Sequence, residues 1–253
     1  MSRPRLLIVN ADDFGFTRDV NDGIVEAHRN GIVTAATLMA NGRAFDHAVA
    51  LWRATPSLDV GCHLVLVQGE SVLEPGRFLP ASLPRLAADV LSGRLRIYEE
   101  LAAQVRRLLE AGIAPTHVDT HKHTHVLPPV LEAVLHVARD FRIPWIRRTL
   151  DVPVVRGLFE RRLRGSGLRA SDHFAGFPLT GRFGTAELIR VIRRLPPGLT
   201  EFMCHPGYCT AELEAAPTRL KASRQRELEA LTARETREAA RETGTRLVSY
   251  REL

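Results

Sequence analysis

The sequence has few of the features that mark secreted, membrane-spanning or nucleotide-binding proteins. Its three cysteines, Cys62, Cys204 and Cys209, are odd in number and form no CxxC pair, which argues against a disulfide framework and favours a reducing, cytoplasmic location. No apolar stretch approaches the ~18 residues of a membrane span. The apolar run before Asn10 is also too short for the core of a signal peptide. No GxGxxG motif follows the first expected strand and no GxxxxGK[ST] motif occurs, so a dinucleotide site and a P-loop lose their main support.

A concentrated basic patch is absent as well. The formal net charge is +6 and the sequence pI is about 9.9, which is compatible with nucleic-acid binding. The arginines, however, are spread along the chain and mixed with glutamates, as in the segment 219–241. Arg234 and Glu238 are spaced i, i+4, which is typical of a solvated helix face. No basic-aromatic motif of an RNA-binding sheet occurs, so we expect no nucleic-acid partner.

Short apolar runs alternate with longer helical patterns along the 253 residues. The expected strands lie in LLIV (6–9), VTAATLMANG (33–42), LDVGCHLVLV (58–67), APTHVD (114–119), IPWIRR (143–148), GLTEFMCHPGY (198–208) and TRLVSY (245–250). The expected helices lie in 20–31, 44–55, 98–113, 127–141 and 184–195, and one long charged helix precedes the last strand.

This alternation predicts an α/β fold with parallel strands and crossover helices. Two architectures compete, namely a closed or distorted (β/α) barrel of seven or eight strands and an open doubly wound sheet. The length suits one large domain, so we expect a single domain over 1–253. Two stretches, 68–95 and 150–182, are expected to be loops or insertions, and substrate specificity is expected to lie there.

Polar residues collect where the expected strands end. Asp12 and Asp13 follow the first strand, His63 lies in the third, and His205 follows a late one. In both parallel architectures the active site lies at the carboxyl ends of the strands, so these side chains are predicted to share one face. Each also has a structural interpretation, because the aspartates can cap the next helix and His63 can be a buried core histidine.

The segment HVDTHKHTHVLPP, residues 117–129, holds four of the ten histidines. One aspartate with two histidines is a sound ligand set for a catalytic divalent ion, and a second adjacent aspartate can act as a base. In an extended segment His121, His123 and His125 would share a face, so crowding limits how many reach one ion.

Four segments, LLIVNADDFG, GCHLVLVQG, PTHVDTHKHTHVLP and EFMCHPGY, resemble the signature blocks of the YdjC-like carbohydrate deacetylases, which include chitooligosaccharide and hopanoid-associated deacetylases. The resemblance covers nearly the whole chain, except 150–198. It implies a barrel-like fold related to polysaccharide deacetylases, one divalent ion (magnesium or zinc), an N-acetylated amino sugar or glycoconjugate as substrate, and a homodimer. It implies ion binding by Asp13, His63 and His121, with Asp12 as general base and His205 as candidate general acid.

The remaining candidates have open roles. Asp119 is expected to hold His121 in the correct tautomer. His123 and His125 are candidates for substrate contacts, for the rim of the site or for a second metal. Arg147 is either a contact to a sugar hydroxyl or a surface arginine. Because of the surplus histidines, a two-metal phosphoesterase stays an alternative, as does a non-catalytic sugar- or metal-binding protein.

Overall fold

The structure, a computed structural model, describes residues 3–148 and 153–253. Within these residues, eight strands belong to one sheet, of which seven follow the order β5-β4-β3-β2-β1-β7-β6 and the eighth, β8, pairs with β1. The strand bounds are β1 Arg5–Phe14, β2 Ala35–Leu38, β3 Asp59–Leu64, β4 His117–Thr120, β5 Trp145–Ile146, β6 His173–Ala175, β7 Gly198–Cys204 and β8 Arg246–Leu247. The pairs β1–β7, β1–β8, β3–β4, β4–β5 and β6–β7 are all parallel, as the alternating pattern predicts.

Helices connect most of these strands. Their bounds are α1 Arg18–Arg29, α2 Phe45–Arg53, α3 Leu83–Leu91, α4 Ile97–Glu110, α5 Pro128–Asp140, α6 Pro153–Leu163, α7 Thr185–Arg193, α8 Ala211–Ala215, α9 Ala222–Thr232 and α10 Arg234–Glu242. Short 3₁₀ turns lie at η1 His121–Val126, η2 Phe177–Leu179 and η3 Tyr250–Glu252. Within the described residues, no helix has both the length and the apolar character needed to cross a membrane.

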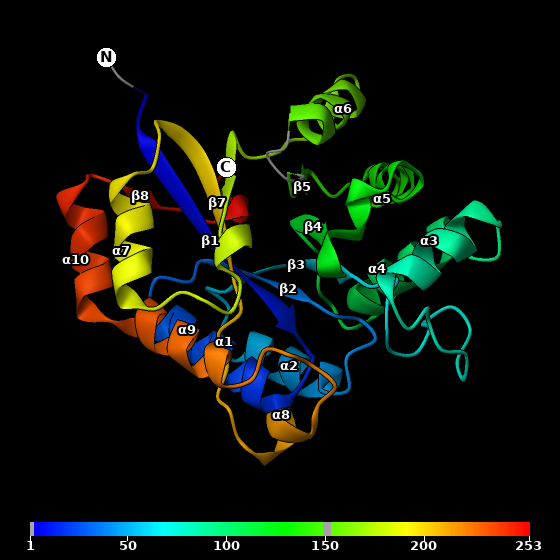
Figure 1. Ribbon diagram of the computed structural model, residues 1–253, viewed down its shortest axis with the longest axis horizontal. Coiled ribbons are helices and arrows are strands. Elements are labelled where there is room, and N and C mark those ends of the chain that lie inside the picture. The colour runs from blue at the N-terminus through cyan, green and yellow to red at the C-terminus, as the bar shows by residue number, and fades with distance from the viewer. Residues whose placement is uncertain (1–2, 149–152) are drawn as a thin grey trace. The chain divides into compact units, whose positions relative to one another are not determined.

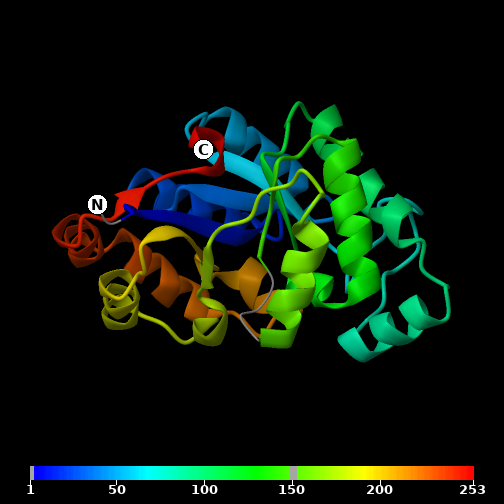
Figure 2. The ribbon, with the colours of Figure 1, turned by 90° about the horizontal axis from the view of Figure 1, so that it is seen from above.

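The chain divides into two compact units, one of residues 1–36, 43–59 and 171–253, and one of 37–42 and 60–170. In the first unit β1 and β7 pair from Arg5↔Gly198 to Ala11↔Cys204. Side chains of both strands, such as Ile8 and Phe202, are buried in the core. Helix α9 packs on α1 and α7, and α7 packs on α10 (Figure 1). Figure 2 shows β8 returning beside β1. This packing fixes the end of β1, where the two aspartates lie.

In the second unit β3 and β4 pair in the register His63↔Asp119, and α4 packs on α5. The strands approach closely, because a Cβ at Gly61 would lie 2.4 Å from the carbonyl oxygen of His117. Only glycine fits at this position, and its lack of a side chain lets β3 pack closely against β4.

The structure corrects three details of the expected elements. Strand β1 continues past Val9 to Phe14, because its pairing with β7 extends to Ala11. Helix α3 forms within a stretch expected to be a loop, since Ser82 caps it and proline lies in its first turn. The long charged helix is broken at Ala233, whose φ of −59° and ψ of 136° are not helical. Residues 149–152 of the second expected insertion lie outside the described residues.

Candidate active site and metal centre

The two aspartates at the end of β1 are buried, with 3% of Asp12 and 4% of Asp13 exposed. Asp13 has a φ of 67°, in the left-handed region that a non-glycine residue adopts only at a cost. Neither aspartate caps the following helix, because the side chain of Thr17 accepts the hydrogen bond from the backbone N–H of Val20 at 3.2 Å. The capping interpretation is therefore wrong, and the burial of two carboxylates needs another explanation.

Part of that explanation is an arginine that sequence reasoning missed. Arg224, on α9, is 1% exposed, and its Nη2 lies 2.5 Å from Oδ2 of Asp13. Its Nε donates to the carbonyl oxygen of Leu220 at 3.3 Å, and its guanidinium lies 5.8 Å from the centre of the Phe16 ring. A buried carboxylate requires such a partner, so Arg224 neutralises Asp13 and fixes its orientation.

Asp12 lies beside His205 in the same unit. Oδ1 of Asp12 accepts a hydrogen bond from the side-chain amide of Asn10 at 3.0 Å, and Oδ2 lies 3.9 Å from Nε2 of His205. That second distance exceeds a direct hydrogen bond, so the two groups can face a common substrate atom. A carboxylate and an imidazole with this spacing are suited to act as base and acid.

Glu227, on α9, is a second buried residue that sequence reasoning missed. Its carboxylate accepts the backbone N–H of His205 at 2.6 Å and the backbone N–H of Gly181 at 2.9 Å. Burial raises the pKa of Glu227 to about 7, although these two hydrogen bonds and the nearby Arg224 lower it. Glu227 thus anchors the backbone of His205 at the end of β7.

In the second unit His63 belongs to a buried polar network. Its Nδ1 lies 2.7 Å from Oδ1 of Asp119, and its side chain is only 2% exposed. The other oxygen of Asp119 accepts from Thr37 at 3.1 Å and pairs with Arg147 at 2.6 Å. Arg147 is fully buried, so it is not a surface arginine. Asp119 was predicted to orient His121, but it contacts His63 instead and fixes the tautomer of that imidazole.

With Nδ1 directed to Asp119, Nε2 of His63 presents its lone pair toward His121. The distance from Nε2 of His63 to Nδ1 of His121 is 3.2 Å, and the two rings meet edge to face at 77°. Two nitrogen ligands of a tetrahedral zinc ion, each about 2.0–2.1 Å from it, lie roughly 3.3 Å apart. The two imidazoles therefore fit as neighbouring ligands of one ion.

The rest of the histidine tract does not follow His121 in an extended strand. Lys122 and His123 have φ values of 54° and 53°, so the chain turns sharply after His121. The expectation of an extended segment with three histidines on one face is therefore wrong. His123 and His125 are buried, and Nδ1 of His125 lies 2.6 Å from the hydroxyl of Thr120. His117 is also buried and bonds to the hydroxyl of Thr116 at 2.9 Å.

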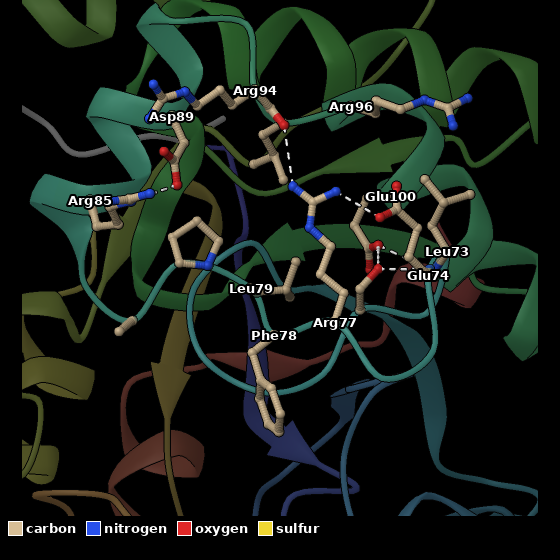
Figure 3. Close-up of a pocket in the computed structure, with 14 residues that line it drawn as sticks. Leu73, Glu74, Arg77, Phe78, Leu79, Arg85, Asp89, Arg94, Arg96 and Glu100 are labelled. Atoms are coloured by element: carbon tan, nitrogen blue, oxygen red, sulfur yellow. Dashed lines mark hydrogen bonds and ion pairs between the residues drawn. The ribbon is translucent and has the colours of Figure 1, made fainter.

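The second unit also holds a cavity of about 430 Å³, between residues 71 and 100. Figure 3 shows the arginines and carboxylates that line it. None of the predicted site residues is among them, so this cavity is distinct from the clusters described above.

The chain resembles known proteins over almost its whole length. A carbohydrate deacetylase from Brevibacillus brevis is 38% identical over 263 residues, covering 98% of this chain and 99% of the relative. A chitooligosaccharide deacetylase from Klebsiella pneumoniae is 37% identical over 255 residues, with 98% and 99% coverage.

Solved structures share the fold. A protein from Enterococcus faecalis V583 named for cellobiose-phosphate cleavage has a TM-score of 0.86 and 26% identity, covering 98% of both chains. A peptidoglycan deacetylase from Bacillus subtilis has a TM-score of 0.50 at 10% identity, covering 98% of this chain and 89% of its own, which bears on the fold alone. The expected relation to polysaccharide deacetylases is confirmed at the level of fold. The sequence model of the YdjC-like protein family matches residues 6–242, and the chain belongs to this family.

Proposed function

We propose that the protein is a metal-dependent hydrolase that removes the N-acetyl group from an N-acetylated amino sugar, releasing acetate and the free amine. The observation that carries the proposal is the pair His63 and His121, whose facing nitrogens lie 3.2 Å apart, with His63 held by the buried Asp119 that pairs with Arg147. Relatives named carbohydrate deacetylase and chitooligosaccharide deacetylase support the choice of reaction and substrate class.

We assign the ion to Asp13, His63 and His121, which make up one candidate ligand set. A second candidate set, Asp12, His63 and Asp119, is less suitable. Both oxygens of Asp119 are already engaged, one by His63 and the other by Arg147 and Thr37. Two imidazoles favour zinc over magnesium, which prefers oxygen ligands. Such an ion supplies Lewis acidity, which polarises the acetyl carbonyl and lowers the pKa of water.

In the reaction, water adds to the acetyl carbonyl carbon while Asp12 accepts a proton from it. Asn10 holds Oδ1 of Asp12 at 3.0 Å, which orients Oδ2 for this task. The C–N bond then breaks, and the electron pair leaves with the nitrogen. An amine needs a proton to leave, and His205 donates it from Nε2, the atom that faces Asp12. The products are acetate and the amino sugar.

The candidate metal ligands argue against the phosphoesterase alternative. A two-metal site needs a further set of ligands, and the surplus histidines were the candidates. Among the residues that the structure describes, neither candidate set includes His123 or His125. The predicted homodimer and cytoplasmic location stay predictions.

The proposal is tested by acetate release from a panel of N-acetylated sugars, with protein stripped of metal and then reconstituted with zinc, magnesium or other ions. We expect release only with a restored ion, near one ion per chain, and only from sugars that carry an acetamide. Release at the same rate from fully stripped protein would contradict the metal dependence. An Asp12→Asn protein that keeps the full rate would contradict the assigned base.

A further inference from the structure

The cavity between residues 71 and 100 has a composition suited to a carbohydrate. Its walls come from the loop 71–81, from α3, from the connector 94–96 and from the first turn of α4. Four arginines and three carboxylates line it, so opposite charges nearly balance (Figure 3). Its volume, about 430 Å³, lies in the ordinary range of ligand pockets.

The inner wall is held by a buried polar network. The carboxylate of Glu100 accepts hydrogen bonds from the hydroxyl of Ser71 and from the backbone N–H groups of Val72, at 3.0 Å, and Leu73, at 3.2 Å. The side chain of Gln104 donates to Glu100 at 2.8 Å and exchanges two hydrogen bonds with the backbone of Val65. Networks of this kind are costly unless every member is satisfied, and they then fix one geometry. This network ties the cavity wall to the chain two residues beyond His63.

The base of the loop is also fixed near the histidine tract. Backbone hydrogen bonds join Gln68 to Pro80 at 2.9 Å and Leu79 to Gly69 at 3.0 Å. Nζ of Lys122, the residue after His121, donates to the side chain of Gln68 at 2.7 Å. The base of the loop is therefore hydrogen-bonded to the residue that follows His121, one of the proposed metal ligands.

Three of the four arginines that line the cavity pair with carboxylates, the weakest of these pairs being Arg96 with Glu99 at 3.5 Å. Arg77 lies 2.6 Å from Glu74, and Arg85 lies 3.0 Å from Asp89. A site for an anion would present cations without carboxylate partners, whereas these arginines already have them. Paired guanidinium and carboxylate groups offer donors and acceptors side by side, which matches the neighbouring hydroxyls of a neutral sugar.

An aromatic side chain completes the cavity. Phe78 is among the lining residues, yet 75% of it is exposed. An exposed aromatic ring in the wall of a cavity can stack on the apolar face of a sugar ring. We propose that this cavity is a sugar-binding subsite that holds a second, neutral unit of the acetylated glycan, with Phe78 stacked on it. The inference rests on the proposed function, which supplies the identity of the glycan. It adds that the substrate has more than one sugar unit.

The test is binding of β-linked N-acetylglucosamine oligomers of one to five units, measured by calorimetry on protein stripped of metal. We expect affinity to rise with oligomer length in the unchanged protein. Phe78→Ala is expected to lower the affinity for the longer oligomers by about tenfold, which corresponds to loss of one aromatic contact. Phe78→Trp keeps a ring and is expected to retain the affinity.

Leu91→Ala is the matched control, because Leu91 is 87% exposed in the same segment but does not line the cavity. We expect this variant to bind every oligomer as the unchanged protein does. Affinity that is independent of length, or equal in Phe78→Ala and the unchanged protein, overturns the subsite. If affinity depends on length and on Phe78, but protein reconstituted with metal releases no acetate from the same oligomers, the subsite stands and the proposed function is contradicted. A change of oligomeric state in Phe78→Ala, with sugar binding unaltered, would assign the ring to a protein interface.

Discussion

The buried pair of Arg224 and Asp13 leads to a quantitative prediction about stability. Replacing Arg224 by Met keeps much of the side-chain volume and removes the cation, so the Asp13 carboxylate stays buried without its 2.5 Å partner. Breaking a buried ion pair from one side costs about 3–5 kcal/mol. This is a large share of the roughly 5–15 kcal/mol by which domains are stable. We therefore expect Arg224→Met to lower the free energy of unfolding of the metal-free protein by about 3–5 kcal/mol.

The assay is urea unfolding followed by circular dichroism, with the free energy extrapolated to zero denaturant. Two variants make the result specific. Adding Asp13→Asn to Arg224→Met removes the uncompensated charge, and we expect the double variant to recover about 2 kcal/mol or more. Arg234→Ala breaks the Glu238 pair, in which the arginine side chain is 87% exposed, and we expect a loss below about 1 kcal/mol.

A loss of less than about 1 kcal/mol in Arg224→Met would refute the reasoning, because it would mean that Asp13 does not depend on this cation. A double variant no more stable than the single one would refute it as well. Because a bound cation would also compensate the Asp13 carboxylate, excess zinc is expected to reduce the deficit of Arg224→Met.

Three further predictions concern the site. Asp12→Asn is expected to slow acetate release by about 10²–10⁴-fold with metal content unchanged, as measured by acetate assay and metal analysis. His121→Ala is expected to lose the ion in equilibrium dialysis. Asp119→Asn is expected to weaken ion binding by about 10–100-fold, because Asp119 orients the ligand His63 and does not bind the ion itself. Glu227 ionises near its ordinary pKa of 4.5 when unfolded and near 7 when folded, so the unfolded state binds fewer protons between these values. The unfolding free energy should therefore fall as pH rises from about 4.5 to about 7, and Glu227→Gln, compared over the same range, should lack that part of the decline.

The positions of the strands, and of the polar residues near their carboxyl ends, could be predicted because they depend on local patterns. Apolar runs followed by polar residues marked β1, β3, β4 and β7, and parallel strands end at a common edge. Helix α3 was missed because its short sequence lies among prolines and glycines, although Ser82 followed by Pro84 is a helix-start signal.

Arg224 and Glu227 could not be assigned because a charged helix was interpreted as a solvated one. Their partners, Asp13 and the backbone of His205, lie far away in the sequence and have no local signature. One signal was present, since positions 224, 227, 228 and 231 have the spacing of a buried helix face and the last two are leucines. A charged residue on such a stripe must find a buried partner, which makes it a candidate site residue.

The histidine tract shows how backbone geometry makes chemically identical side chains unequal. His117 and Asp119 lie in β4, where Asp119 is opposite His63 in the register and therefore holds its Nδ1. His121 is the first residue after that strand, which brings its Nδ1 to Nε2 of His63. The left-handed turn at Lys122 and His123 then redirects the chain, and His125 bonds back to Thr120. Spacing in the sequence could not separate these roles, because they depend on where the strand ends and on the direction in which the chain turns.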